Sequence, residues 1–106
     1  MEMKLDPQQF DKRQAILVER IAETIKVKLR EQDIEGEKLE HLTSEITFSI
    51  TNILDDMAAI EDDGIEVRPY LTFLTDDEEL LHYGENSCTN EFVYTTLNKL
   101  FAKKRD

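Results

Sequence analysis

A long apolar stripe in residues 39–57 constrains the fold of this chain more than any other feature. Its members are Leu39, Leu42, Ile46, Ile50, Ile53, Leu54 and Met57. Nearly all of the steps between them are three or four residues, which places the stripe on one side of an α-helix. Neither Gly nor Pro interrupts it, so we expect a buried helix from about Glu37 to about Ile60.

Another helix is predicted before this one. Asp6 and Pro7 form a typical helix start, with Asp6 as the N-cap and Pro7 at the first helical position. Apolar residues then keep helical spacing, so this helix is expected to run from about Pro7 to about Gln32. Residues 33–37 are a short connector, which predicts an antiparallel helix pair. Residues 1–5 carry no pattern and are expected to be a loose N-terminus.

Strand signals occur only after the second helix. The polar residues 61–64 are expected to end that helix, because Gly64 allows an unstrained turn. Residues 65–73 then alternate with a period of two, which is typical of a strand. A shorter strand is predicted over residues 80–83, after a turn at residues 75–78. Together they predict a β-hairpin, which must pack on the helices or on another chain because a lone hairpin is marginal in water.

The last predicted element is a short helix near the C-terminus. Ser87, Thr89 or Asn90 is expected to cap it, and residues 103–106 follow as a basic tail. We therefore predict one domain, residues 1–106, of the α+β class. It combines a long antiparallel helix pair, a β-hairpin packed on that pair and a short C-terminal helix, in the order α-α-β-β-α.

The net charge of −11 belongs mainly to the middle of the chain. Residues 33–91 carry 17 acidic and 2 basic residues, a net charge of −15. Such a surface repels nucleic acid and anionic membranes, so we expect direct contact with neither, and a protein partner with a basic face instead. The candidate partner-binding residues are the acids clustered near the predicted turns: Asp55, Asp56, Glu61, Asp62, Asp63, Asp76, Asp77, Glu78 and Glu79.

These features favour a non-enzymatic protein-interaction module, such as an adaptor, a chaperone or an immunity-type inhibitor. The alternative is a DNA mimic, in which carboxylates replace phosphates and block a DNA-binding protein. A mimic requires acids in a row along one face, whereas an adaptor requires an apolar groove rimmed by acids. The ordinary interpretation of the acidic clusters is solvated loop charge without a partner.

The third possibility is a small enzyme or a metal site around His82, Glu85 and Cys88. These residue types bind zinc, but a closed site needs four ligands, and the other histidine, His41, is far away in the sequence. Because catalytic and phosphate-binding motifs are missing, we expect neither enzymatic activity nor a cofactor nor a metal. The single cysteine cannot form an internal disulfide. The sequence also has no signal peptide and no apolar run long enough to span a membrane. Together these features predict a cytoplasmic protein.

Three apolar residues lie outside the predicted stripes. Ile16 and Val27 are 11 positions apart on the first helix, which is close to three full turns, and Phe48 lies away from the stripe of the second helix. They are either ordinary exposed apolar residues or part of a second face that another copy of the chain covers. We expect the second arrangement, a homodimer.

Overall fold

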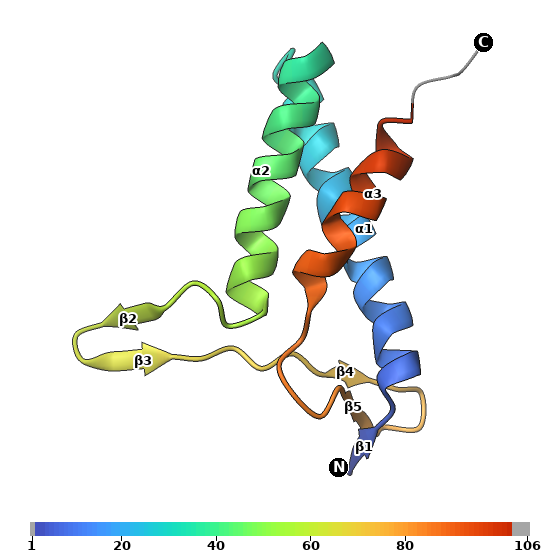
Figure 1. The fold of residues 1–106 in the computed structure, drawn as a ribbon, viewed down its shortest axis with the longest axis vertical. Coiled ribbons are helices and arrows are strands. Elements are labelled where there is room, and N and C mark those ends of the chain that lie inside the picture. The colour runs from blue at the N-terminus through green and yellow to red at the C-terminus, as the bar shows by residue number, and fades with distance from the viewer. Residues whose placement is uncertain (1, 103–106) are drawn as a thin grey trace.

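The computed structural model describes residues 2–102, so the predicted basic tail at residues 103–106 lies outside the described residues. The fold is α+β, with a pair of long packed helices, small sheets that include a β-hairpin, and a C-terminal helix, in the predicted order (Figure 1). The elements are β1 (Met3–Leu5), α1 (Pro7–Glu31), α2 (Gly36–Leu54), β2 (Ile60–Asp62), β3 (Ile65–Val67), β4 (Phe73–Leu74), β5 (Leu80–His82), η1 (Thr89–Phe92) and α3 (Val93–Leu100).

The molecule is flat rather than spherical. Helices α1 and α2 run antiparallel, and α3 packs on both of them (Figure 1). The principal extents are 48 × 39 × 21 Å and the radius of gyration is 15.9 Å, whereas a compact domain of about 100 residues has a radius of gyration near 13 Å. No helix within residues 2–102 is both long enough and apolar enough to cross a membrane.

Helix α1 begins where the sequence predicted. The Asp6 carboxylate accepts a hydrogen bond from the backbone N–H of Gln9 at 3.1 Å, and Pro7 occupies the first helical position. Asp6 is therefore a true N-cap. The helix ends at Glu31, and the left-handed residue Asp33, with a φ of 63°, then reverses the chain. Asp tolerates this conformation better than most side chains.

Helix α2 ends at Leu54, six residues before the predicted end. The backbone N–H of Met57 donates to the carbonyl of Asn52 at 2.8 Å, and that of Asp56 donates to the carbonyl of Ile53 at 3.3 Å. Asp56 has a φ of 60°. These bonds form a Schellman motif with an aspartate in the position that glycine usually takes. The prediction missed this end because no glycine marked it.

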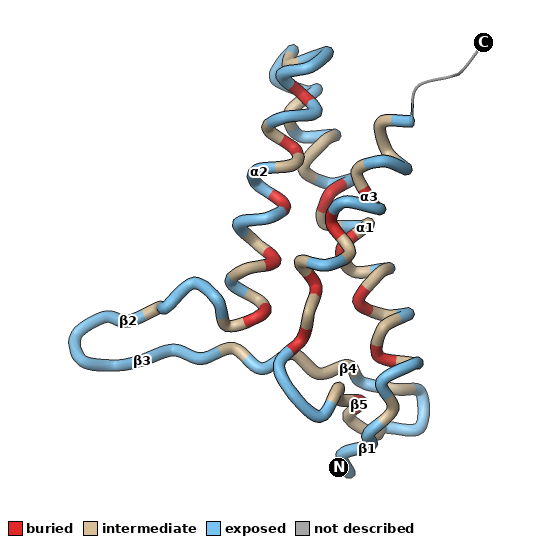
Figure 2. Tube along the Cα trace, in the orientation of Figure 1, coloured by how far each residue is buried: buried red, intermediate tan, exposed pale blue. Residues whose placement is uncertain are grey.

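The sequence also predicted the wrong buried face for α2. The fully or nearly fully buried positions follow a four-residue line that is mostly polar: Leu39, Thr43, Thr47, Thr51 and Asp55. By contrast, Ile46 is 37% exposed, Ile53 is 44% exposed and Met57, beyond the helix end, is 62% exposed. Figure 2 shows the buried positions of α2 repeating along its length. The apolar stripe therefore lies beside the core rather than inside it.

The side chain of Asp55 explains this rotation of α2. Its carboxylate is 3% exposed and accepts hydrogen bonds from the hydroxyl of Ser87 at 2.6 Å, the hydroxyl of Thr89 at 2.7 Å and the backbone N–H groups of Thr89 and Asn90 at 2.9 Å each. A buried carboxylate needs such donors. Turning α2 to bring Asp55 to them also turns the threonine line inward.

These bonds replace the caps that the sequence predicted for the last helix. Ser87, Thr89 and Asn90 form no side-chain cap on their own helix, and η1 and α3 both begin without one. The Asp55 carboxylate instead bonds two backbone N–H groups at the start of η1. A negative charge at a helix N-terminus is favourable. The bonds join residues more than 30 positions apart and hold η1 and α3 against α2.

The β structure differs from the prediction in its pairing. The expected strand over residues 65–73 is divided at Pro69, which cannot donate to a ladder. Its first part, β3, pairs antiparallel with β2, and its last part, β4, pairs antiparallel with β5. Residues 61–64 are therefore part of a hairpin and do not directly end α2. The predicted pairing between the end of this segment and residues 80–82 is confirmed.

The N-terminus is ordered, contrary to the prediction. Strand β1 pairs in parallel with β5, with Met3 opposite Leu80 and Leu5 opposite His82, which gives a sheet in the order β1-β5-β4. Side chains behind this sheet hold it to α1. The ring of Phe10 lies 4.9 Å from the ring of Phe73 and 5.4 Å from that of Tyr83, centroid to centroid, within the range of favourable aromatic pairs.

The buried threonine line leads to a first prediction. The Thr43 hydroxyl is buried without a hydrogen-bond partner among the described residues, so Thr43→Val should raise the free energy of unfolding by about 1 kcal/mol. Thr47→Val is the matched control, because the Thr47 hydroxyl donates to the Thr43 carbonyl at 2.6 Å and its loss should bring no such gain. Urea unfolding measures both. A loss of stability in Thr43→Val would contradict the arrangement.

The Asp55 bonds lead to a second prediction. Asp55→Asn keeps the shape of the side chain but turns an NH₂ donor toward groups that are themselves donors, so we expect a loss of about 3 kcal/mol of unfolding free energy. Asp56→Asn is the matched control. Among the described residues its carboxylate pairs with the exposed guanidinium of Arg68 alone, at 2.9 Å, so the loss should be below about 1 kcal/mol. Equal losses in the two variants would contradict the role of Asp55.

Candidate functional site

The most exposed structured feature is the hairpin formed by β2 and β3, which we call the arm (residues 60–67). The arm projects sideways from the lower end of α2 (Figure 1). Among the described residues, the strands β2 and β3 pack substantially only on each other. Asp63 and Gly64, between the strands, both have positive φ, 51° and 76°, as the tight turn of a two-residue hairpin requires. Figure 2 shows the arm as exposed along nearly its whole length.

The two faces of the arm differ in chemistry. Glu61 lies directly opposite Glu66 in the ladder, and neighbouring pairs point to the other face because strand side chains alternate. Like charges in directly opposed positions destabilise a hairpin. The other face carries Ile65, which is 66% exposed and lies opposite Asp62, and Val67, which lies opposite Ile60. A two-stranded arm with this surface is only marginally stable in water.

An ion pair connects the arm to the helical body. The guanidinium of Arg68, immediately after β3, contacts the carboxylate of Asp56 at 2.9 Å, and this hydrogen bond raises the pKa of Arg68 above its ordinary value. The Asp56 side chain is largely covered, at 11% exposed. Asp56 therefore orients the base of the arm and offers little carboxylate surface to a partner.

The other acids predicted to bind a partner fall into two further groups. Asp55 is buried and fully engaged with the start of η1, so it presents no charge at the surface. Asp76, Asp77 and Glu78 are exposed in the turn between β4 and β5, and Glu79 there is half-buried. This turn lies on the side of the lower end opposite the arm (Figure 1). The structure thus places the exposed acids among these candidates in two groups, one in the arm and one in the turn between β4 and β5.

His82, Glu85 and Cys88 have different neighbours. The His82 ring lies 3.5 Å from the hydroxyl of Tyr70, and Cys88 contacts Gln14. Glu85 is exposed in the loop after β5. Within residues 2–102, no three His, Cys, Asp or Glu side chains are grouped so that they could hold a metal ion.

Cys88 is held by a buried glutamine. Gln14, which is 0% exposed, accepts a hydrogen bond from the Cys88 backbone N–H at 2.8 Å and places its amide nitrogen 3.4 Å from the thiol sulfur. Burial raises the pKa of the Cys88 thiol, although the Gln14 hydrogen bond opposes that change. The thiol is therefore mostly protonated at neutral pH, a state that disfavours nucleophilic chemistry.

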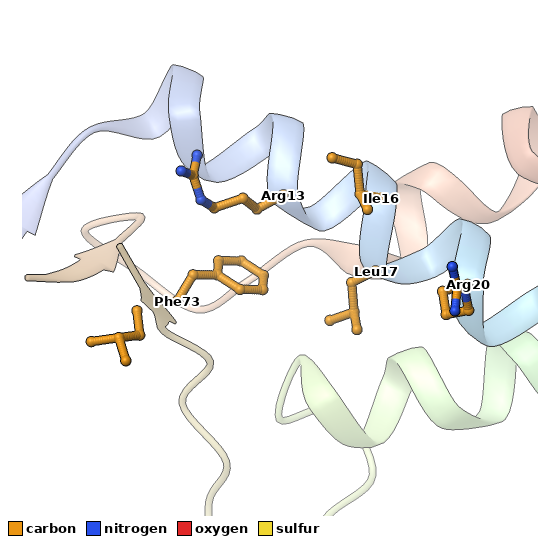
Figure 3. Close-up of a pocket in the computed structure, with 6 residues that line it drawn as sticks. Arg13, Ile16, Leu17, Arg20 and Phe73 are labelled. Carbon is orange, nitrogen blue, oxygen red and sulfur yellow. The ribbon is translucent and has the colours of Figure 1, made fainter. Parts of the chain in front are cut away.

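A shallow hollow of about 400 Å³ lies between α1 and β4. Its lining is apolar, with Leu17 and Phe73 at its centre, and two guanidinium groups, those of Arg13 and Arg20, stand at its edge (Figure 3). Ile16 and Leu74 complete the lining. Sequence reasoning did not single out this site, because its residues come from segments more than 50 positions apart.

The residues predicted to mediate self-association are exposed. Ile16 is 67% exposed at the border of the hollow, whereas Val27 and Phe48 are 47% and 40% exposed elsewhere on the helices. The turn of the arm had a local sequence signal, Asp63-Gly64, which the prediction interpreted as the end of the second helix. Asp-Gly between two runs containing apolar residues is a strong hairpin signal, and residues 60–67 contain it.

Comparison of the chain with protein-family models, with curated proteins and with solved structures finds no match. The chemistry of the arm and of the hollow is therefore the basis for a functional conclusion.

The position of Cys88 leads to a third prediction. Since the thiol pKa is raised in the folded protein, the unfolded chain releases this proton first, and the contribution of Cys88 to stability is lost as the pH rises above about 8.5. The thiol should react several-fold more slowly with a disulfide reagent at about pH 8 in the folded than in the urea-unfolded protein. Equal rates would contradict the burial of the thiol.

Proposed function

We propose that the protein is a non-enzymatic interaction module, an adaptor or inhibitor, whose acidic arm binds a basic face of a protein partner. The observation that carries this proposal is the arm itself. It is a two-stranded hairpin that projects from the body, with Glu61 opposite Glu66 and with exposed Ile65. A free hairpin with these features is poorly stable alone, which supports a role in which a partner completes it.

The two faces of the arm indicate the chemistry of this partner. Lys or Arg side chains would neutralise the opposed glutamates, and an apolar patch beside them would cover Ile65 and Val67. The strands also have free edges, to which an extended segment of the partner could add as a further strand. The separation of the candidate acids into two groups favours this protein partner over the DNA-mimic alternative, which requires those acids in one row.

Charge reversal of the arm leads to a fourth prediction. A Glu61→Lys/Glu66→Lys variant should lose the partners that the wild-type protein captures from a lysate at low salt, and wild-type capture should weaken at high salt because the contacts are ionic. Asp76→Lys/Asp77→Lys is the matched control. It makes the same change in net charge in the turn between β4 and β5, away from the arm, and should retain the partners.

A photo-crosslinking residue at position 65 identifies the contact directly. We expect cross-links to a partner segment rich in Lys and Arg next to apolar residues. Capture that is unchanged by the arm variant, or lost equally in both variants, would show that the arm is not the binding surface. Circular dichroism of both variants confirms that the helices remain folded.

A further inference from the structure

The hollow beside α1 has a charge opposite to that of the protein as a whole. The chain carries a net charge of −11, yet the apolar lining at Leu17 and Phe73 is bordered by Arg13 and Arg20. The Arg13 guanidinium donates to the backbone carbonyl and side-chain oxygen of Gln9, each at 3.1 Å. Arg20 makes no side-chain hydrogen bond or ion pair within residues 2–102. The site therefore fits a ligand surface that is apolar and acidic.

Helix α2 of the same chain presents such a surface. Ile46 and Ile53 are exposed on the stripe that the rotation of α2 leaves outside the core, and Ile50 between them is half-buried. Glu45, directly before Ile46, is exposed, and within residues 2–102 its carboxylate pairs with the ring of His41 alone, at 3.4 Å. Apolar side chains with an adjacent carboxylate are what the hollow requires.

The hollow and the α2 stripe lie on the same face of the helix pair. Nine residues span two and a half turns of a helix, so residues nine apart lie on opposite sides. Leu17 is nine residues before Lys26, whose ammonium group bonds the Leu100 carbonyl of α3 at 2.8 Å. Ile46 is nine residues before Asp55, which bonds the start of η1. Leu17 and Ile46 are therefore both on the side away from the C-terminal helix.

We propose that two copies of this chain pack through this face, with the α2 stripe of each copy seated on the α1 hollow of the other. A two-fold axis parallel to the helices places α1 of one copy over α2 of its partner. The result is a four-helix interface made from α1 and α2 of both copies. This interface is distinct from the arm, so the dimer and the proposed partner binding can be tested independently of each other.

Arg20 of the hollow and Glu45 of the α2 stripe lie at nearly the same height along the helix axes, as this packing requires. Arg20 precedes the end of α1 at Glu31 by 11 residues, and Glu45 follows the start of α2 at Gly36 by 9. In an antiparallel pair the two residues therefore lie at levels about 3 Å apart. A two-fold axis parallel to the helices preserves these levels, so Arg20 faces the partner's Glu45, within reach of a long arginine side chain.

A dimer interface of ordinary size would take only a small share of the surface of each copy. A stable interface of ordinary size takes roughly 800 Å² from each partner, about a tenth of the 7739 Å² that one copy exposes. The repulsion that a net charge of −11 causes is reduced at this face. Most acids lie after residue 32, and those of the arm extend away from the helix pair, whereas Arg13 and Arg20 are at the interface.

The mass in solution tests the dimer, and an exchange of charges tests its geometry. Light scattering at micromolar concentration should give twice 12.4 kDa. Arg20→Glu alone and Glu45→Arg alone should each weaken the dimer by about tenfold or more, because each places like charges at both symmetric contacts. An equimolar mixture of these two variants should regain the dimer mass, because in the mixed dimer every contact again joins opposite charges.

Substitutions inside and outside the proposed interface test which face of the helix pair forms the dimer. Ile53→Glu should give the monomer mass, whereas Phe48→Glu, on another side of α2, should leave the dimer intact. Circular dichroism shows that each variant is folded, and all of the changed residues are exposed. A monomer mass for the wild type, no recovery in the mixture, or dissociation by Phe48→Glu but not by Ile53→Glu would overturn the proposal.

Discussion

The buried carboxylate of Asp55 determines the arrangement of the helices in this protein. It lies just after the last residue of α2 and accepts four hydrogen bonds from Ser87, Thr89 and Asn90. A charge removed from water requires donors of this kind. Because η1 and α3 have no side-chain cap of their own, the same bonds secure the start of the C-terminal helical segment. One side chain thus fixes the rotation of α2 and the attachment of η1 and α3.

The rotation of α2 has consequences for the surface. It turns threonines toward α1 and leaves Ile46 and Ile53 exposed. Threonine is a less effective core residue than isoleucine, because its hydroxyl must find an acceptor or remain unpaired. The flat shape, 21 Å in its shortest extent, leaves the helix pair uncovered on the side away from α3. An apolar face that the fold does not use internally is the kind of surface that another chain covers.

The two proposed surfaces would act together in a dimer. The arm leaves the molecule near the end of α2 that is remote from the connector to α1 (Figure 1). A two-fold axis parallel to the helices keeps both arms at the same end of the assembly. Two arms on one side would bind a partner with two basic sites more tightly than either arm alone, because the second contact becomes intramolecular. The acidity of the arms would then serve recognition without entering the helix interface.

The sequence by itself determined the elements that depend on neighbouring residues. Asp6 and Pro7 set the start of α1, and apolar residues spaced by three and four positions indicated both long helices. The segment at residues 73–82 indicated the pairing of β4 with β5. The Asp-Gly turn of the arm was also local and could have been predicted. These features follow from backbone propensity, capping and turn chemistry, which act over a few residues.

Only the tertiary structure decided which face of α2 is buried, how β1 is paired and which residues line the hollow. Asp55 meets its donors across more than 30 residues, and β1 meets β5 across more than 70. The apolar periodicity favoured burial of the isoleucine face of α2. That periodicity reflects only the free energy gained by burying apolar side chains. It does not include the cost of a buried charge, which Asp55 avoids only when α2 turns the threonine face inward.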